Sequence, residues 1–258
     1  EGNRFFYVNP LESVPEVCYD NTQRHHVKPE RQKWFACACC PPNIARLIGG
    51  LWDYIYTAAE DTVNVHLYIA GDAKVQVGNS ILNITQTTSY PENGRIHFKV
   101  QADTDREITL ALRIPGWAEH YTLRLNGQEL TPDKVEKGYA YLTRPWAEAA
   151  ELEVEFDMQP RFMCANRKIH YDLGRTAIMR GPVVYCLEEV DNGKYLGELS
   201  VDTQAGLIEE KKEEFGGFVA LKAQGSRLHV PETDQLYMNY NAKREKAELT
   251  AVPYHLWN

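Results

Sequence analysis

Residues 107–114, EITLALRI, place an apolar side chain at every second position, which is the pattern of a β-strand with one buried face. The same alternation recurs in three other short segments, VNVHLYI (63–69), RIHFKV (95–100) and ELEVEF (151–156). The turn signals PENG (91–94) and NG (126–127) lie between such segments. Short alternating strands joined by polar turns predict an antiparallel β-sandwich, which we place at residues 59–160.

Residues 161–258 are more irregular but contain further strand candidates. These candidates are residues 183–187, GFVALKAQ (217–224) and AELTAVPYHLW (247–257). They predict a second β-sandwich domain in this part of the chain. The charge run IEEKKEEFGG (208–217) is interpreted as a solvated loop or helix face, because charged side chains prefer contact with water.

One amphipathic helix is expected at residues 41–58, beginning at a proline that needs no N–H partner there. Its apolar residues follow the helical period and form one stripe, namely Ile44, Leu47, Ile48, Leu51, Ile55 and Tyr56. Gly49-Gly50 within the pattern lowers helix propensity and predicts close packing against a neighbour. No second convincing helix covers the stripe, and such a helix needs partners. We therefore expect a C-terminal fragment, whose helical partners lie upstream.

Three cysteines precede this helix in the segment WFACACC (34–40). The unpaired N–H groups and the dipole at a helix start favour the thiolate form, which binds zinc and attacks electrophiles. In an extended segment Cys37 and Cys39 share a face and Cys40 points away, so two of the three could bind one metal. The pattern leaves three alternatives open: packed structural thiols, a local zinc site completed by His25 and His26, or a catalytic thiol.

Composition restricts the class of protein and its partners. The chain has 258 residues and a formal charge of −8, from 36 acidic and 28 basic side chains, so we expect no nucleic-acid partner. Its apolar runs are far too short to span a bilayer, so we expect no membrane partner. Its six cysteines are clustered and too few for a disulfide scaffold, which favours metal binding or thiol chemistry.

The segment ACACCPPNIARLIGGL (36–51) resembles the bacterial β-L-arabinofuranosidases of glycoside hydrolase family 127, to which family 146 is closely related. Three other segments share the resemblance, FFYVNPLES (5–13), LRIPGWA (112–118) and RTAIMRGPVVYCLE (175–188). The resemblance implies a mainly β chain in which β-sandwich domains follow the tail of an (α/α)6 barrel. Residues 1–58 would end that catalytic barrel, and residues 59–160 and 161–258 would form the sandwiches. It leaves open that the last strand returns to the first sandwich.

The resemblance also implies a reaction and a cofactor. Family members release terminal β-L-arabinofuranose from plant glycans with retention of configuration, using zinc held by three cysteines and one glutamate. By motif position Cys39 would be the nucleophile and a zinc ligand, Cys40 would be a second zinc ligand, and Cys37 would be neither. The acid/base glutamate and the remaining ligands belong upstream, so we expect this chain alone to be inactive. The compartment stays open between cytoplasm and periplasm.

Several other residues are weaker candidates. Tyr7 could contact the sugar or a cysteine, although a half-buried structural tyrosine is the simpler interpretation. Trp117 and Trp146 are expected to pack at strand ends, with a carbohydrate platform as the alternative, and Cys164 and Cys186 are expected to be buried thiols. The rival function is a non-catalytic β-sandwich module that binds glycan or assembles a homodimer through a sandwich domain.

Overall fold

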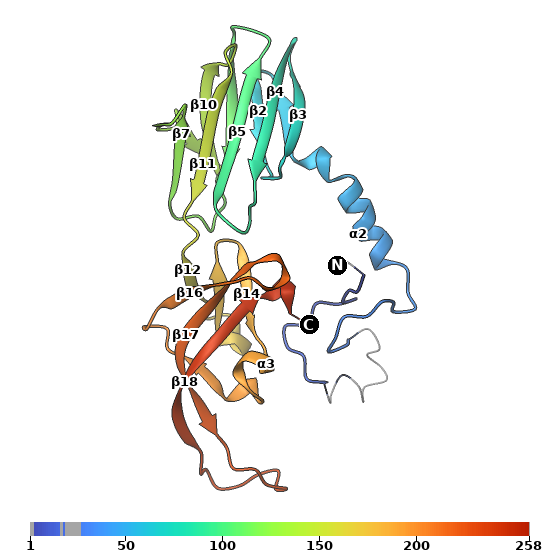
Figure 1. Ribbon diagram of the computed structural model, residues 1–258, viewed down its shortest axis with the longest axis vertical. Coiled ribbons are helices and arrows are strands. Elements are labelled where there is room, and N and C mark those ends of the chain that lie inside the picture. The colour runs from blue at the N-terminus through green and yellow to red at the C-terminus, as the bar shows by residue number, and fades with distance from the viewer. Residues whose placement is uncertain (1–2, 16–17, 19–26, 258) are drawn as a thin grey trace. The chain divides into compact units, whose positions relative to one another are not determined.

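The computed structural model describes residues 3–15, 18 and 27–257 (Figure 1). The chain divides into a smaller unit that ends at Tyr56 and a larger unit, Thr57–Trp257. Strands dominate the larger unit, and the prediction of a mainly β fold is confirmed.

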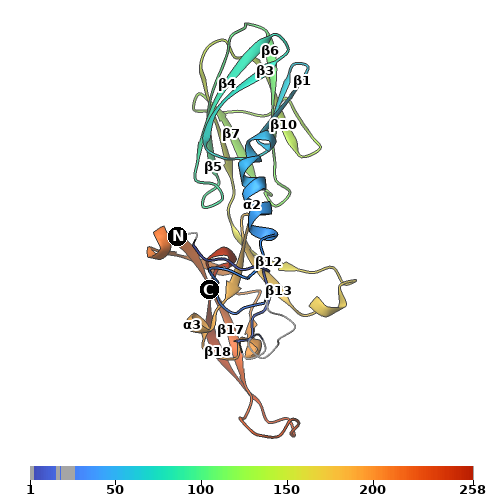
Figure 2. The same cartoon turned by 90° about the vertical axis from the view of Figure 1, so that its right-hand side faces the viewer.

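The first domain of the larger unit is a sandwich of two sheets, whose strands Figures 1 and 2 show as two layers. The first sheet has the order β1-β2-β6-β10-β9, formed by Tyr56–Ala59, Thr62–Val65, Glu107–Arg113, Tyr139–Pro145 and Lys134–Glu136. The second has the order β3-β4-β5-β11-β7-β8, formed by Gly71–Val77, Ser80–Thr88, Arg95–Ala102, Ala150–Phe156, Tyr121–Leu125 and Gln128–Glu129.

The alternation seen in the sequence places one face of each sheet in the core. Every second residue of β5 is buried, and β4 follows the same pattern over most of its length. Phe98 on β5 lies opposite Leu152 on β11, and both are fully buried. The central pairs β6–β10 and β5–β11 are antiparallel as predicted, whereas β2 runs parallel to β6.

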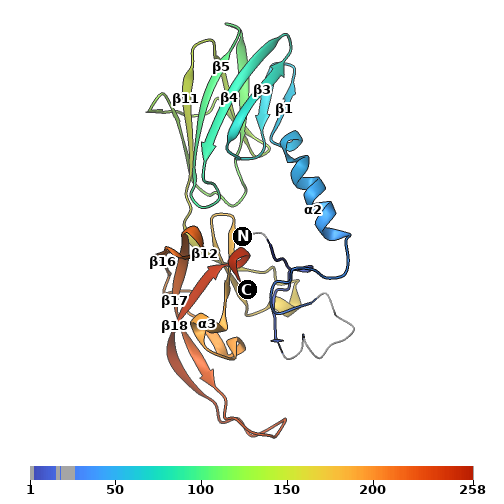
Figure 3. The same cartoon turned by 45° about the vertical axis from the view of Figure 1, so that its right-hand side comes forward.

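The strands after residue 159 form one hydrogen-bonded sheet in the order β12-β13-β14-β18-β17-β15, with β16 also paired to β17. Their bounds are Pro160–Cys164, Thr176–Arg180, Val183–Leu187, Lys243–Pro253, Phe218–His229, Leu199–Val201 and Leu207–Lys212. The strands β12 and β16 lie near opposite edges and contact each other, so the sheet curls around a small core. The last strand stays in this sheet between β14 and β17 and does not return to the first sandwich. Figure 3 shows the long β17–β18 hairpin that crosses the domain.

Short helices complete the larger unit. They are α3 (Glu189–Asn192) and the 3₁₀ helices His170–Asp172, Leu196–Glu198, Glu214–Gly216 and Tyr254–Leu256. Within the residues that the structure describes, no helix is both long enough and apolar enough to cross a membrane.

The interpretation of residues 208–217 as a loop or helix face is wrong over its first half, because Leu207–Lys212 forms the strand β16. This strand is paired along only one side, and Lys212 binds the carboxylate of Glu210 at 2.8 Å. Charged side chains suit an unpaired strand edge because they oppose pairing with another chain.

The helix expected at residues 41–58 is shorter than predicted. Helix α2 spans Cys40–Gly49, the 3₁₀ helix Leu51–Tyr54 follows, and β1 begins at Tyr56. Among the described residues no atom lies within 4 Å of the place that a Cβ of Gly49 would occupy, so the close packing expected there stays a prediction about partners upstream. The glycine pair ends the helix. Within the described part of the chain α2 has no buried residue, and Ile44, Leu47 and Ile48 are each more than half exposed.

Candidate active site

A backbone pairing in the smaller unit brings Tyr7 to the cysteine cluster. Phe5 and Gln32 exchange both of their backbone hydrogen bonds, each 2.9 Å long. The buried ring of Phe35 then contacts the rings of Phe5 and Tyr7, at centroid distances of 5.2 and 5.6 Å. Because Phe35 lies two residues before Cys37, this aromatic packing holds the Tyr7 hydroxyl beside the thiols.

Cys39 lies at the centre of the cluster. Its sulfur is 3.5 Å from the sulfur of Cys37 and 3.7 Å from the sulfur of Cys40. The hydroxyl oxygen of Tyr7 lies 2.6 Å from the Cys39 sulfur and 3.2 Å from the Cys37 sulfur. Cys39 is also exposed, so its sulfur combines polar neighbours with access for a ligand. The structure thus brings together Tyr7, Cys39 and Cys40, the three predicted site residues.

The start of α2 leaves the cysteine side chains available. Cys39 is the N-cap residue, yet no side chain caps the helix. Pro41 and Pro42 occupy the first turn and carry no N–H, so two of the groups that normally need a cap are absent. The remaining N–H groups and the helix dipole still favour negative charge near the sulfurs.

The hydrogen bonds of Tyr7 determine its protonation. Bonds to the sulfurs of Cys37 and then Cys39 raise the pKa of the Tyr7 phenol well above its ordinary value. A phenol with a raised pKa keeps its hydrogen and can donate it to an ionised sulfur. Tyr7 therefore suits a role as a hydrogen-bond donor to the cluster.

Two of the sulfurs fit a tetrahedral zinc ion. Zinc–sulfur bonds of about 2.3 Å at the tetrahedral angle place two thiolate ligands about 3.8 Å apart. The Cys39 and Cys40 sulfurs are separated by 3.7 Å. Among the residues that the structure describes, no group of three or more His, Cys, Asp or Glu side chains forms a metal cluster. His25 and His26 lie outside the described residues, so a locally completed zinc site stays a prediction.

Cys37 is the neighbour that the sequence did not assign a role. The spacing indicated that it shares a face with Cys39, but its contact with Tyr7 joins residues 30 positions apart and has no signal in the local pattern.

Two further thiols, Cys164 and Cys186, belong to the larger unit. Cys164 and Cys186 are both free, so they form no disulfide. The prediction that Cys164 is buried is wrong, because it ends the edge strand β12 and is exposed. Cys186 is partly buried, and burial raises the pKa of its thiol to about 12.

Trp146 and Trp117 pack against other parts of the protein, as expected. Trp146 is buried, and its indole N–H donates to the carbonyl of Ile108 at 2.8 Å. Trp117 is half-buried, stacks on Tyr90 with ring centroids 6.4 Å apart, and meets Phe156 edge-on at 5.7 Å.

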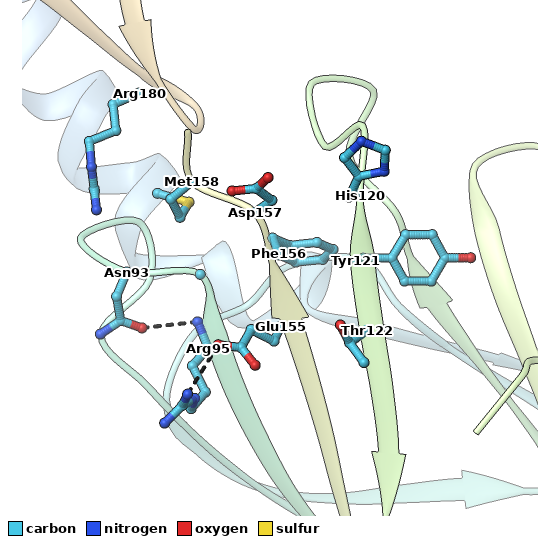
Figure 4. A pocket seen from close by; sticks show the side chains of 11 residues that line it. Asn93, Arg95, His120, Tyr121, Thr122, Glu155, Phe156, Asp157, Met158 and Arg180 are labelled. Carbon is cyan, nitrogen blue, oxygen red and sulfur yellow. Dashed lines mark hydrogen bonds and ion pairs between the residues drawn. The ribbon is translucent and has the colours of Figure 1, made fainter. Parts of the chain in front are cut away.

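An open pocket of about 640 Å³ lies in the larger unit, where β5 and β7 begin and β11 ends (Figure 4). Phe156 on its floor is buried, so this ring cannot stack on a sugar. Arg95 binds the Glu155 carboxylate at 3.0 Å, and Arg180 donates to the carbonyl of Glu92 at 3.0 Å. Its arginines already have protein partners, so the pocket gives little support to a glycan-binding module.

Three family models match consecutive parts of the chain. They are the β-L-arabinofuranosidase family 127 catalytic domain at residues 1–52, the family 127 middle domain at residues 62–158 and the family 127 C-terminal domain at residues 160–258. Together these matches cover nearly the whole chain.

Individual relatives of the chain are also described as arabinofuranosidases. The non-reducing end β-L-arabinofuranosidase of Bifidobacterium longum subsp. longum is 37% identical over 277 aligned residues, which include the whole chain and 40% of the relative. The crystal structure of a family 127 β-L-arabinofuranosidase from Geobacillus stearothermophilus T6 is 38% identical, with a TM-score of 0.89 over 99% of this chain and 41% of that one. A second family 127 β-arabinofuranosidase is 32% identical, with a TM-score of 0.83 over 99% of this chain and 40% of that one.

The β-sandwich and these matches place the chain among the domains that make up glycoside hydrolase families. Within that class the chain belongs to glycoside hydrolase family 127. The chain spans about 40% of the length of the curated relative that it matches.

Proposed function

We propose that the protein carrying this sequence releases terminal β-L-arabinofuranose from plant glycans, with retention of configuration and with Cys39 as its nucleophile. One observation carries this proposal. The exposed Cys39 sulfur lies at the start of α2 with the Tyr7 hydroxyl 2.6 Å away. The names of the relatives support the substrate class.

The chemistry needs a nucleophile and a proton donor. Most retaining glycosidases use a pair of carboxyl groups for these two roles. Here the Cys39 sulfur would form a bond to the anomeric carbon while the glycosidic C–O bond breaks and the departing oxygen takes a proton. Water would then displace the sulfur from the same carbon and lose its proton to the group that protonated the departing oxygen, so two inversions give net retention. The resemblance assigns the proton donor to a glutamate upstream of this chain.

Tyr7 would orient the nucleophile. The hydrogen bond from the Tyr7 hydroxyl would restrain the Cys39 sulfur before attack. It would also stabilise the negative charge that develops on the sulfur as it departs. The hydroxyl also lies at the exposed side of the cluster, where it could contact a sugar as the sequence suggested.

Cys39 and Cys40 would hold zinc, because both are thiols and their separation fits two tetrahedral ligands. When bound, zinc supplies a positive charge that keeps the sulfurs ionised. The other ligands would come from a part of the protein upstream of this chain.

Activity tests the proposal directly. We would compare the 258-residue chain with a version extended upstream to the length of its relatives, using an aryl β-L-arabinofuranoside. The extended protein should hydrolyse it, Cys39→Ala should abolish turnover, and the short chain should be inactive. Hydrolysis by the short chain, or full activity of Cys39→Ala, would contradict the mechanism.

The zinc content shows whether the zinc ligands all lie within this chain or partly upstream of it. The short chain should lack tightly bound zinc after gel filtration, whereas the extended protein should retain about one ion, as a single four-ligand site requires. One zinc ion in the short chain would instead indicate a local shell that includes His25, His26 or Cys18. The same gel filtration would show whether the protein is a homodimer, which stays a prediction.

A further inference from the structure

Cys37 contacts the proposed nucleophile, although neither the zinc site nor the attack requires it. Its sulfur lies 3.2 Å from the Tyr7 hydroxyl and 3.5 Å from the Cys39 sulfur, and the residue is half-buried. The residue before it, Ala36, has φ 57°, a left-handed conformation that alanine usually avoids. The backbone therefore adopts an unfavourable turn immediately before this thiol.

The number of hydrogens in the cluster limits which groups can donate in these contacts. The proposed nucleophile is the Cys39 thiolate, which can only accept, so the single hydroxyl hydrogen of Tyr7 would follow the shorter contact, 2.6 Å, to its sulfur. The Cys37 thiol hydrogen can then point to the Tyr7 oxygen or directly to the Cys39 sulfur. In the first case the thiol donates to the Tyr7 oxygen and strengthens the hydrogen bond from Tyr7 to Cys39. In the second case the thiol itself donates to Cys39. Both arrangements stabilise negative charge on Cys39.

Stabilisation of that charge affects the two half-reactions in opposite ways. When the sulfur attacks the anomeric carbon it loses negative charge, so a donor stabilises the starting state more than the transition state. When water breaks the carbon–sulfur bond, the electron pair returns to sulfur and the donor stabilises the transition state. A donor to Cys39 therefore helps the second step and gives the first step no advantage.

We propose that Cys37 is a positioning residue that, through its thiol hydrogen, promotes departure of the Cys39 sulfur in the second half-reaction. This inference rests on the proposed function, because it requires a sugar bound covalently to Cys39. It assigns a role to the one thiol of the cluster that the zinc site does not use.

Rapid-quench kinetics on the upstream-extended protein can separate the two steps. Release of the aryl group measures formation of the glycosyl-enzyme, and intact-mass analysis of the protein measures its hydrolysis. For Cys37→Ala we expect the hydrolysis rate constant to fall about five- to tenfold, less than for an ordinary hydrogen bond to a charged group because a thiol is a weak donor. Formation should not slow, and the glycosylated enzyme should accumulate, so that kcat and KM fall together.

Two further variants control for packing. Cys37→Ser keeps a hydrogen-bond donor and should retain hydrolysis within about twofold of the parent protein. Cys164→Ala removes an exposed thiol on β12 and should change neither step. Equal loss in Cys37→Ser and Cys37→Ala, or an unchanged hydrolysis rate in Cys37→Ala, would overturn the role of Cys37.

The parent protein separates this inference from the proposed function. If it forms no adduct on Cys39, the proposed mechanism fails, and the role of Cys37 fails with it. If the adduct forms and both Cys37 variants behave like the parent, only the role of Cys37 is wrong. If Cys37→Ala does not fold, Cys37→Val, which is close in size and carries no donor, takes its place in the comparison with Cys37→Ser.

Discussion

The two units of the chain differ in what stabilises them. In the first sandwich, core residues such as Phe98, Leu110 and Trp146 are at most 1% exposed. In the described part of the smaller unit, α2 has no buried residue, and Trp52 just beyond it is 70% exposed. The sandwich therefore has its own core, whereas the described part of the thiol cluster is positioned by the Phe5–Gln32 backbone pairing and by the packing of Phe35 against Phe5 and Tyr7.

This difference separates stability from chemistry. Burial of apolar surface contributes most of the favourable free energy of folding, so the stability of the described chain resides mainly in its strands. The Cys39 sulfur instead needs access for substrate, which a tightly packed core would deny. We infer that substitutions in the sandwich change stability and substitutions in the cluster change activity, with little overlap.

The largest expected effect is the loss of Trp146. Trp146→Ala empties a fully buried site and removes the hydrogen bond to the Ile108 carbonyl, so the free energy of unfolding should fall by about 3–5 kcal/mol. Denaturant unfolding followed by far-UV circular dichroism measures this loss. The matched control is Ile48→Ala on the exposed face of α2, which should change stability by less than about 0.5 kcal/mol. A comparable loss for Ile48→Ala would show that the two units share one core.

Two glycines make the same comparison through the backbone. A Cβ at Gly94 would lie 2.1 Å from the carbonyl oxygen of Phe156, which is backbone and cannot easily move. Gly94→Ala should therefore cost about 1–3 kcal/mol of unfolding free energy. A Cβ at Gly49 meets no atom of the described residues within 4 Å, so Gly49→Ala should cost nothing, and helix α2 should gain up to about 1 kcal/mol of local propensity. Thermal unfolding of both variants tests this contrast, which equal losses would refute.

The strands were the most predictable part of the fold. Residues such as Ile96 and Phe98 alternate with polar ones, and a two-residue period is typical of a strand with one buried face. The strand β16 escaped prediction because its sequence carries charges on both faces, and only its pairing with β17 makes it a strand. The end of α2 was placed too late, because the apolar stripe continues past the glycine pair that stops the helix.

The site was predictable mainly in its local part, and Tyr7 was a weaker candidate for contact with a cysteine. The cysteine pair and the helix start are neighbours in sequence, so the motif could indicate Cys39 and Cys40. The contact of Tyr7 with Cys37 depends on the pairing of Phe5 with Gln32, which has no periodic signal. Contacts between distant segments of irregular chain cannot be read from local patterns.

The reactivity of the thiols also distinguishes the two units. Iodoacetamide should modify the exposed Cys39 in the native chain but reach the partly buried Cys186 only after unfolding. Burial raises the pKa of Cys186 from 9.0 to about 12, so between these values the folded chain keeps a proton that the unfolded chain releases. The protonated Cys186 thiol therefore contributes to the free energy of unfolding, in full below pH 9, and this contribution is lost as the pH rises to 12.

The size of the alkaline effect is modest because solvent reaches Cys186. We expect the difference in unfolding free energy between the parent chain and Cys186→Ala to shift by less than about 1 kcal/mol between neutral and strongly alkaline pH. Urea titrations at several pH values measure that shift. An identical pH dependence in the two proteins would show that Cys186 does not titrate differently on folding.

The smallest effect is expected on the outer face of the sandwich, where Arg124 binds Glu153 at 2.6 Å and Glu155 at 3.0 Å. Arg124 and then Arg95 lower the pKa of Glu155, so their stabilisation is present above the ordinary pKa of the carboxyl group and is lost as the pH falls. Arg124→Met should lower Tm by about 1–2 °C at neutral pH, because surface ion pairs contribute little. The difference should vanish at high salt, where exposed charges are screened, and at acid pH, where Glu155 is protonated. A loss of Tm that persists under both conditions would mean that Arg124 stabilises the sandwich through packing of its aliphatic stem. Partly exposed side chains on this face would then contribute to the apolar packing of the sandwich.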